Sequence, residues 1–262
     1  HWLGGSAAAV GWADRQAIEV TEFAVIIAPG RFDATPRQAR AAWDEYRRLA
    51  DVILGTEYGS GKFDAAFDAD GWGYFRGKGE CVVAWSDVFE PAWKNAGHAD
   101  RIGKAFYRGG NHSARTPITV MPLRIGDRVI RFCVTHMPAH IQAGDGFRRT
   151  TPRVIQQAAA WVSALAVLGK WSRRSKRNNP HSAEVVAGDW NVDMHRAHWR
   201  AVIRTALGLR CAKPLTKGGD LDKRLVSWPF YRGLRVVSTE ILPKQDGFDH
   251  RAVLIRFRIK EK

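Results

Sequence analysis

The chain has 262 residues, 45% of them hydrophobic and 11% aromatic, so it can bury a large core and is not intrinsically disordered. It carries 41 Lys and Arg against 26 Asp and Glu, a net charge of +15. This excess favours a polyanionic partner (nucleic acid, an anionic membrane surface or a phosphorylated ligand), although a generally basic protein could also carry it. Three cysteines do not make a disulfide framework. No apolar run has the length of a membrane span, which predicts a soluble protein of unassigned compartment, and no feature indicates an obligate protein partner.

Residues 1–20 are rich in Gly and Ala near the start and predict a loosely ordered arm, with a single domain over 21–262. Within that domain the apolar run Glu22–Ala28 predicts a first strand. Thr35-Pro36 is a good helix start, and apolar residues at helical spacing continue to about Ala50. Asp51–Gly55 predicts a second buried strand, which Glu57 follows directly. Glu57 is then either a solvated loop residue or a functional carboxylate at the end of a strand.

The middle of the chain alternates expected strands and irregular segments. Tyr58–Gly79 reads as a surface excursion, Glu80–Trp85 as a strand, and Val88–Gly110 as irregular or helical. The segments Thr116–Leu123 and Arg128–Thr135 predict a β-hairpin, because a Gly-containing turn joins them. His136 follows the second hairpin strand. A single histidine at a strand end is usually structural, but its edge position favours a functional role.

Thr151-Pro152 opens the clearest helix, whose apolar stripe ends at Gly169. The densest basic run, Lys170–Asn179, comes next and is expected to be a loop before the following strand. A solvated loop is the simpler interpretation. As a group, its cations could instead hold a nucleic-acid backbone, and the residues expected to do so are Arg173, Arg174, Lys176 and Arg177.

The stretch Glu184–Asp193 contains the central motif of the chain, a predicted strand followed by polar residues. Val185–Ala187 predicts a buried strand, and Gly188 lets the backbone turn so that Asp189 and Asn191 emerge at its end. On an extended chain these two side chains would point the same way and Trp190 the opposite way. A carboxylate beside a neutral amide can take a proton or hold a metal-bound water while the amide donates to a phosphate. Gly, Asp and Asn also favour ordinary turns, so the motif alone leaves both interpretations open.

The last third adds short strands and further polar residues. His195 and His198 have a metal-like spacing, but without further ligands nearby they are interpreted as a polar helix face. Asp220–Ser227 leads into a strand, and Asp249-His250 precedes an alternating strand, a pair suited to imidazole orientation or metal-assisted phosphate chemistry. The remaining expected strands are Arg235–Ser238 and Ala252–Ile259.

Short motifs occur in a fixed order along nearly the whole chain, from Phe23 to Ile259: Glu57 after D-V-I-L-G-T, T-H at Thr135-His136, G-D-W-N at Gly188–Asn191, L-D-K-R-L-V-S at Leu221–Ser227 and D-H at Asp249-His250. Together they resemble the endonuclease/exonuclease/phosphatase superfamily, which includes DNase I and the exonuclease III type of repair nucleases. The resemblance implies a four-layer α/β sandwich with two central mixed β-sheets flanked by helices. It also implies hydrolysis of a phosphoester by an activated water, with Mg²⁺ or Mn²⁺ as cofactor.

The resemblance also implies roles for individual residues. Glu57 would be the metal carboxylate, Asp249 would border the metal, and His136 would contact the phosphate. Asp189 would hold or activate the attacking water, and Asn191 would donate to the phosphate. Asp222 would orient His250, and Glu80 matches the place where DNase-like members carry a Glu that steadies the first His.

The chain departs from the family at the end of its first strand. The family usually has an Asn there that helps to hold the metal, whereas this chain reads V-I-I-A-P-G over Val25–Gly30. Asp33 is one candidate substitute, and Glu57 acting with less help is the other.

From the motifs and the charge together we expect a metal-dependent nuclease acting on DNA. Two alternatives stay open: a phosphatase or phosphodiesterase on a phospholipid or inositol phosphate, and a catalytically silent nucleic-acid-binding member.

Overall fold

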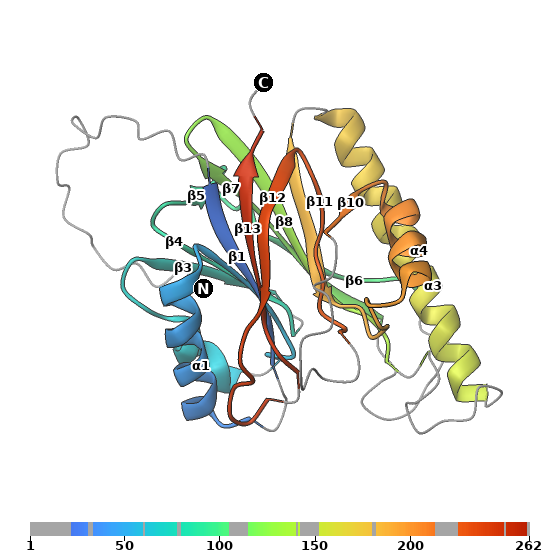
Figure 1. Cartoon of the computed structure of the whole chain (residues 1–262), viewed down its shortest axis with the longest axis horizontal. Coiled ribbons are helices and arrows are strands. Elements are labelled where there is room, and N and C mark those ends of the chain that lie inside the picture. The colour runs from blue at the N-terminus through green and yellow to red at the C-terminus, as the bar shows by residue number, and fades with distance from the viewer. Residues whose placement is uncertain are drawn as a thin grey trace.

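The structure is a computed structural model that describes residues 22–30, 34–59, 61–77, 80–104, 115–139, 141, 152–179, 182–212, 225–248 and 250–260. Two mixed β-sheets pack face to face, with α1 outside one sheet and α3 and α4 outside the other (Figure 1). This is the four-layer α/β sandwich predicted from the motifs. The expected arm over residues 1–20 lies outside the described residues.

The first sheet has the strand order β12-β13-β1-β2-β4-β3. Among the described strands of this sheet, the only parallel pair is β1 with β2, so these two strands end at the same edge of the sheet. Pro29 pairs with Thr56 there, and Glu57 follows at once. The strands are β1 (Glu22–Pro29), β2 (Val52–Thr56), β3 (Trp72–Arg76), β4 (Val82–Ser86), β12 (Leu234–Ile241) and β13 (Val253–Ile259).

The second sheet has the order β10-β11-β9-β8-β7-β5, with β6 paired to β7. Its parallel pair is β8 with β9, and the register places His136 directly beside Asp189. Each sheet thus contributes one pair of parallel strands whose ends carry polar residues. The strands are β5 (Glu90–Pro91), β6 (His98–Ile102), β7 (Thr116–Ile125), β8 (Arg128–His136), β9 (Ala183–Asp189), β10 (Arg210–Cys211) and β11 (Phe230–Arg232).

The helices follow from local sequence signals. Helix α1 (Pro36–Leu49) begins with a capping box, in which the Thr35 side chain accepts from the Gln38 amide and the Gln38 side chain accepts from the Thr35 amide. Helix α4 (Ala197–Leu207) ends at Gly208, whose φ of 67° suits a left-handed cap. The remaining helices are the 3-10 turn η1 (Gly61–Phe63), α2 (Asp64–Phe67) and α3 (Pro152–Asn178).

Three sequence predictions about secondary structure are wrong. The expected surface excursion Tyr58–Gly79 contains β3, and its Tyr58, Phe63 and Phe67 rings are buried under α1, because a cluster of edge-on aromatic contacts holds them there. The segment expected to be irregular or helical contains β5 and β6. Helix α3 does not end at Gly169 but runs on through Asn178, because Gly169 packs closely on the carbonyl of Ala206 and does not break the helix.

The core has two parts. The larger one lies between the sheets and continues to the helix layer, where Trp161, Leu165 and Leu168 pack with Ile203 of α4. The smaller one lies between the first sheet and α1, around Trp43 and Tyr46. Among the described residues, no helix is both long and apolar enough to cross a membrane.

Candidate active site

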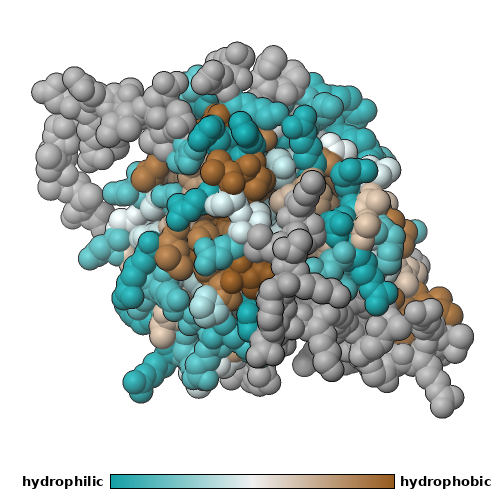
Figure 2. All heavy atoms as spheres, viewed as in Figure 1, coloured by the Kyte–Doolittle hydropathy of each residue, from teal (hydrophilic) through white to brown (hydrophobic). Residues whose placement is uncertain are grey.

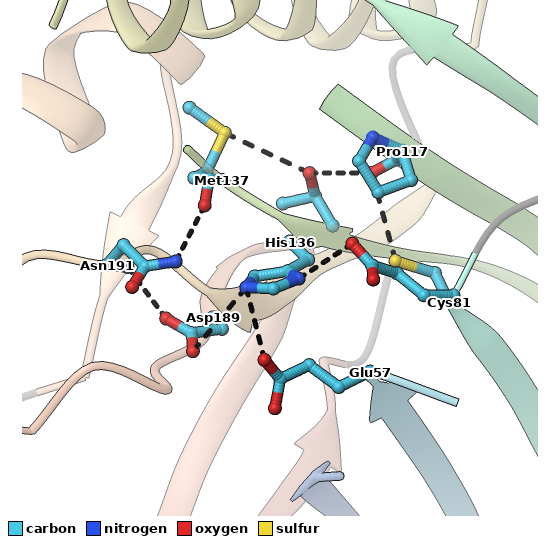
Figure 3. A network of polar contacts seen from close by, with 9 residues as sticks. Glu57, Cys81, Pro117, His136, Met137, Asp189 and Asn191 are labelled. Carbon is cyan, nitrogen blue, oxygen red and sulfur yellow. Dashed lines mark hydrogen bonds and ion pairs between the residues drawn. The ribbon is translucent and has the colours of Figure 1, made fainter. Parts of the chain in front are cut away.

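Four polar side chains from both sheets meet at one edge of the sandwich. Glu57 follows β2, Glu80 precedes β4, His136 ends β8 and Asp189 ends β9. The imidazole of His136 lies between Glu80 on its Nδ1 side and Glu57 and Asp189 on its Nε2 side (Figure 3). The carboxyl ends of the two parallel strand pairs therefore create the site, as expected for an α/β sheet.

His136 is held in a strongly negative environment. Its Nδ1 lies 2.7 Å from Oε1 of Glu80, while its Nε2 lies 3.8 Å from Oε1 of Glu57 and 4.0 Å from Oδ2 of Asp189. Burial alone would lower its pKa, but the hydrogen bond to Glu80 and the charges of Glu80, Asp189 and Glu57 together raise the pKa to about 10. The raised pKa favours the imidazolium form of the ring, with Nδ1 donating to Glu80.

Two of the site residues have unusual backbone conformations. Glu57 has φ 64° and Asn191 has φ 54°, a left-handed region that costs a side-chain-bearing residue free energy. Asn95 is the only other residue besides glycine with positive φ in the described part of the chain. Such strain persists when the surrounding structure imposes it, and here it turns the Glu57 carboxylate toward His136.

Asp189 and Asn191 form a tight turn. The Asn191 amide donates to Oδ1 of Asp189 at 2.7 Å, and its side-chain Nδ2 donates to the Met137 carbonyl at 2.7 Å. The expectation that both side chains project from an extended chain is therefore wrong, since Asn191 has left the extended region, but Trp190 does point into the core. One N–H of the Asn191 amide group is used by Met137, and the second is left for another acceptor.

Gly188 has a different role from the one expected. It lies inside β9 with φ 141°, and a Cβ there would be 1.9 Å from the Thr135 carbonyl oxygen of β8. Only glycine permits this close approach. The approach brings the end of β9 against the end of β8, where Asp189 and His136 stand side by side.

Ser227 is a buried residue beside the site that the candidate set from the sequence omitted. It pairs with Asp189 in an isolated antiparallel bridge, is 1% exposed, and its hydroxyl has no hydrogen-bond partner. Directly opposed residues of an antiparallel pair project to the same side, with Cβ atoms about 5 Å apart. The serine was visible in the L-D-K-R-L-V-S motif, but the motif does not reveal that its hydroxyl is buried next to Asp189.

Other predicted site residues are not all brought together. His250 lies three residues before β13, at the edge where Val253 pairs with Ile27 near the end of β1. Asp33, Asp222 and Asp249 lie outside the described residues, so their expected roles remain predictions. His195 is at the start of the turn before α4, and His198 is in its first turn.

The basic run is not part of this site. Arg173, Arg174, Lys176 and Arg177 lie in the last turns of α3, which leads into the start of β9, whereas Asp189 ends β9. Six residue steps of strand separate the two ends of β9, a distance of about 20 Å. These four cations therefore lie at the edge opposite Asp189, and their expected contact with a nucleic-acid backbone stays a prediction.

The side chains present suit a hard divalent cation. Glu57 and Asp189 present carboxylate oxygens toward the same imidazole nitrogen, and Mg²⁺ needs only one or two protein carboxylates because it keeps several waters. Within the described residues no group of three or more His, Cys, Asp and Glu side chains could hold a metal ion by itself. The donor set therefore fits Mg²⁺ or Mn²⁺ better than a metal that needs a complete protein cage.

Comparison with solved structures identifies the fold. The catalytic domain of human Nocturnin, solved with bound sulfate, superposes with a TM-score of 0.64 at 12% identity, over 92% of this chain and 95% of that one. An endonuclease/exonuclease/phosphatase protein of Bacteroides vulgatus gives 0.64 at 14% identity, over 92% and 100%. A mannosyl-6-phosphatase of Bacteroides thetaiotaomicron gives 0.59 at 11% identity, over 90% and 100%.

No family model and no curated protein sequence matches the chain. At these identities the structural likeness establishes the fold. The resemblance that the ordered motifs predicted is confirmed at that level, and the chain has the fold of the endonuclease/exonuclease/phosphatase superfamily.

Proposed function

We propose that the chain is a metal-dependent phosphodiester hydrolase that cleaves nucleic acid, with DNA as the expected substrate. One observation carries the proposal: the carboxylates of Glu57 and Asp189 approach the same Nε2 of a histidine whose other nitrogen is held by Glu80. Two carboxylates within about 4 Å of one imidazole nitrogen repel each other, so they are stable together when a cation lies among them. The imidazolium supplies one such charge, and a divalent cation would supply another.

Each site residue has its own role in hydrolysis. Asp189 accepts a hydrogen bond from the attacking water and orients it toward phosphorus. The water oxygen forms the new P–O bond as its proton passes to Asp189, while the ester P–O bond breaks and the departing oxygen takes up a proton from solvent. His136 Nε2 and the free N–H of Asn191 donate to the nonbridging oxygens, where negative charge develops. Glu80 keeps the ring of His136 in position through Nδ1.

A divalent cation held by Glu57, with Asp249 as the expected second carboxylate, would stabilise the negative charge of the phosphate and of the leaving oxygen. Glu57 suits this role because its strained backbone fixes the carboxylate without help from a neighbouring side chain on β1. The end of β1 has no room for such a side chain, since a Cβ on Gly30 would lie 2.5 Å from the Thr56 carbonyl oxygen and 3.0 Å from the Tyr58 ring.

Charge supports nucleic acid as the substrate. A net charge of +15 concentrates a polyanion near the surface, and the phosphodiester backbone of nucleic acid is such a polyanion. The second candidate is a small phosphoester, for example a phospholipid head group or an inositol phosphate. It is favoured by the mannosyl-6-phosphatase, which has the same fold and a substrate unrelated to nucleic acid.

A third candidate is a binding protein without activity, and the absence of a side chain on Gly30 favours it, because the site then lacks a ligand from β1. Incubation with plasmid DNA, RNA and inositol phosphates, each with Mg²⁺ and with EDTA, separates the three. Mg²⁺-dependent nicking of plasmid supports the proposal. Release of phosphate from inositol phosphates alone would select the second candidate, and binding without turnover of any substrate would select the third.

A further inference from the structure

The edge of the sandwich opposite the candidate active site is strongly basic. Helix α3 ends there, β12 begins there, and β13 terminates there (Figure 1). The Arg232–Gly233–Leu234 link joins the two sheets at this edge, and the Arg128 side chain donates to the Lys260 carbonyl across it. We call the exposed cations here the distal basic surface: Arg173, Arg174, Lys176, Arg177, Arg210, Arg235, Arg258 and Lys260.

The described acidic residues on this edge leave most of the distal basic surface unpaired. Glu184 is buried and is shared by Arg131 and Arg232, Glu22 pairs with Arg258, and Asp127 pairs with Arg128. Within the described part of the chain, Arg174, Lys176, Arg177, Arg210 and Arg235 form no ion pair. Arg235 also lies directly opposite Arg258 in the β12–β13 pair, and the ion pair of Arg258 with Glu22 offsets that like-charge contact.

From this arrangement we infer that the distal basic surface binds the phosphate backbone of nucleic acid at a second place, away from the bond that is cleaved. The inference rests on the proposed function only for the identity of the polymer. A strand of seven residues separates the two edges at β9, so a phosphate bound at the end of α3 lies about 20 Å from Asp189. Only a long or bent nucleic acid, or a second segment of it, can occupy both places.

The composition of the surface favours nucleic acid over a membrane. Six of its eight cations are arginines, whose planar fork matches phosphate, and they are spread over helix and strand ends as several separate backbone contacts would require. An interfacial membrane site needs exposed aromatic or long aliphatic side chains that enter the lipid. The exposed large hydrophobics described on α3, α4 and β12 are Ile155, Val162, Val167, Val202 and Val237, and the isoleucine lies in the first turn of α3, far from the basic end. The upper right of Figure 2, over the end of α3, is correspondingly hydrophilic.

The test uses a triple substitution, Arg174→Gln, Arg177→Gln and Arg235→Gln. Arg173 is left in place because it donates to the Ala206 carbonyl and supports the α3–α4 contact. The matched control, Arg40→Gln, Arg48→Gln and Lys94→Gln, removes the same charge from exposed positions on α1 and on the β5–β6 connection. Binding is measured in EDTA, which keeps it independent of hydrolysis, on a long duplex and on a duplex of about eight base pairs across a series of salt concentrations.

The triple variant should bind the long duplex about tenfold or more weakly than the control at low salt. Its slope of log affinity against log salt should be smaller by about two to three, since each lost backbone contact removes about 0.9. Affinity for the short duplex, and turnover of a small phosphodiester, should match the control.

Equal losses in the two triple variants would overturn the inference, because general charge would then explain binding. So would loss of binding to phosphatidylserine vesicles with long-duplex binding unchanged, which would make the surface a lipid site. If every hydrolysis assay failed, that would count against the proposed function, but the binding measurements in EDTA would still test the distal basic surface.

Discussion

Nδ1 of His136 lies 2.7 Å from Oε1 of Glu80, although the two residues are 56 positions apart in the chain. The contact joins the two sheets, because Glu80 leads into β4 of the first and His136 ends β8 of the second. It fixes the ring so that Nε2 faces Glu57 and Asp189, and a carboxylate on the other side of an imidazole sets which nitrogen carries the proton.

Replacing Glu80 by Gln keeps an acceptor near Nδ1 and removes the charge. A hydrogen bond to a charged group contributes about 1.5–3 kcal/mol, so kcat should fall roughly ten- to hundredfold while KM changes little. Steady-state kinetics on a small phosphodiester measure this. Glu80→Asp, which shortens the side chain, should lose at least as much, and wild-type kcat in both variants would show that Glu80 does not position His136.

The strained backbone of Glu57 should lower the stability of the fold, while its carboxylate binds the metal. Glu57→Gly relieves a left-handed backbone at φ 64°, so the free energy of unfolding should rise by about 1 kcal/mol while metal binding is lost. Glu57→Gln keeps the strain and should raise only the Mg²⁺ concentration needed for the half-maximal rate. Urea denaturation and Mg²⁺ titration by calorimetry measure the two effects. A destabilised Gly variant, or Mg²⁺ affinity unchanged in both, would contradict this role.

Glu184 should contribute to stability rather than to chemistry. It is 1% exposed, and Arg131 and Arg232 both contact its carboxylate, with Ser172 of α3 donating to it at 3.0 Å. Glu184→Gln leaves two poorly exposed guanidinium groups uncompensated and should lower the free energy of unfolding by about 3–5 kcal/mol. Glu22→Gln, which breaks the exposed pair with Arg258, is the control and should cost less than about 1 kcal/mol. Similar losses in the two variants would mean that burial of the pair does not matter.

Ser227 should support Asp189. Because its buried hydroxyl has no partner, Ser227→Ala should leave the free energy of unfolding unchanged or slightly higher. The hydroxyl is placed to donate to Asp189 or to the attacking water during the reaction, so kcat should fall about tenfold with KM unchanged. Ser86→Ala is the matched control, since the Ser86 hydroxyl is also buried without a partner but lies at the far end of β4. Equal kcat in the two variants would make Ser227 a packing residue.

Local signals in the sequence predicted most of the fold. The Thr35 capping box, the apolar strands and the Gly126 hairpin are each specified by neighbouring residues, and the structure contains them. The predictions failed where tertiary contacts decide. Gly169 predicts a helix end, but α3 continues because the glycine packs against α4, and β3 forms because β4 offers it a pairing edge.

The site was partly predictable for a related reason. Strand ends in α/β sheets collect functional residues, so Glu57, His136 and Asp189 could be grouped before their contacts were known. The left-handed turn at Asn191 and the burial of the Ser227 hydroxyl depend on how β9, β8 and the Ser227 bridge fit together. The basic run was expected to be a loop, but it forms the last turns of α3, so its position near the start of β9 depended on the true end of that helix.

The most direct test of the proposed chemistry is Asp189→Asn, measured for both hydrolysis and binding. The substitution keeps the shape of the side chain and its contact with the Asn191 amide, but it removes the group that accepts a hydrogen bond from water and takes its proton. It also removes one negative charge beside the phosphate. Hydrolysis of plasmid in Mg²⁺ should fall by at least about 10³-fold while affinity for the same DNA is equal or slightly higher. Wild-type hydrolysis by Asp189→Asn on every phosphoester tried would contradict the assignment of this site.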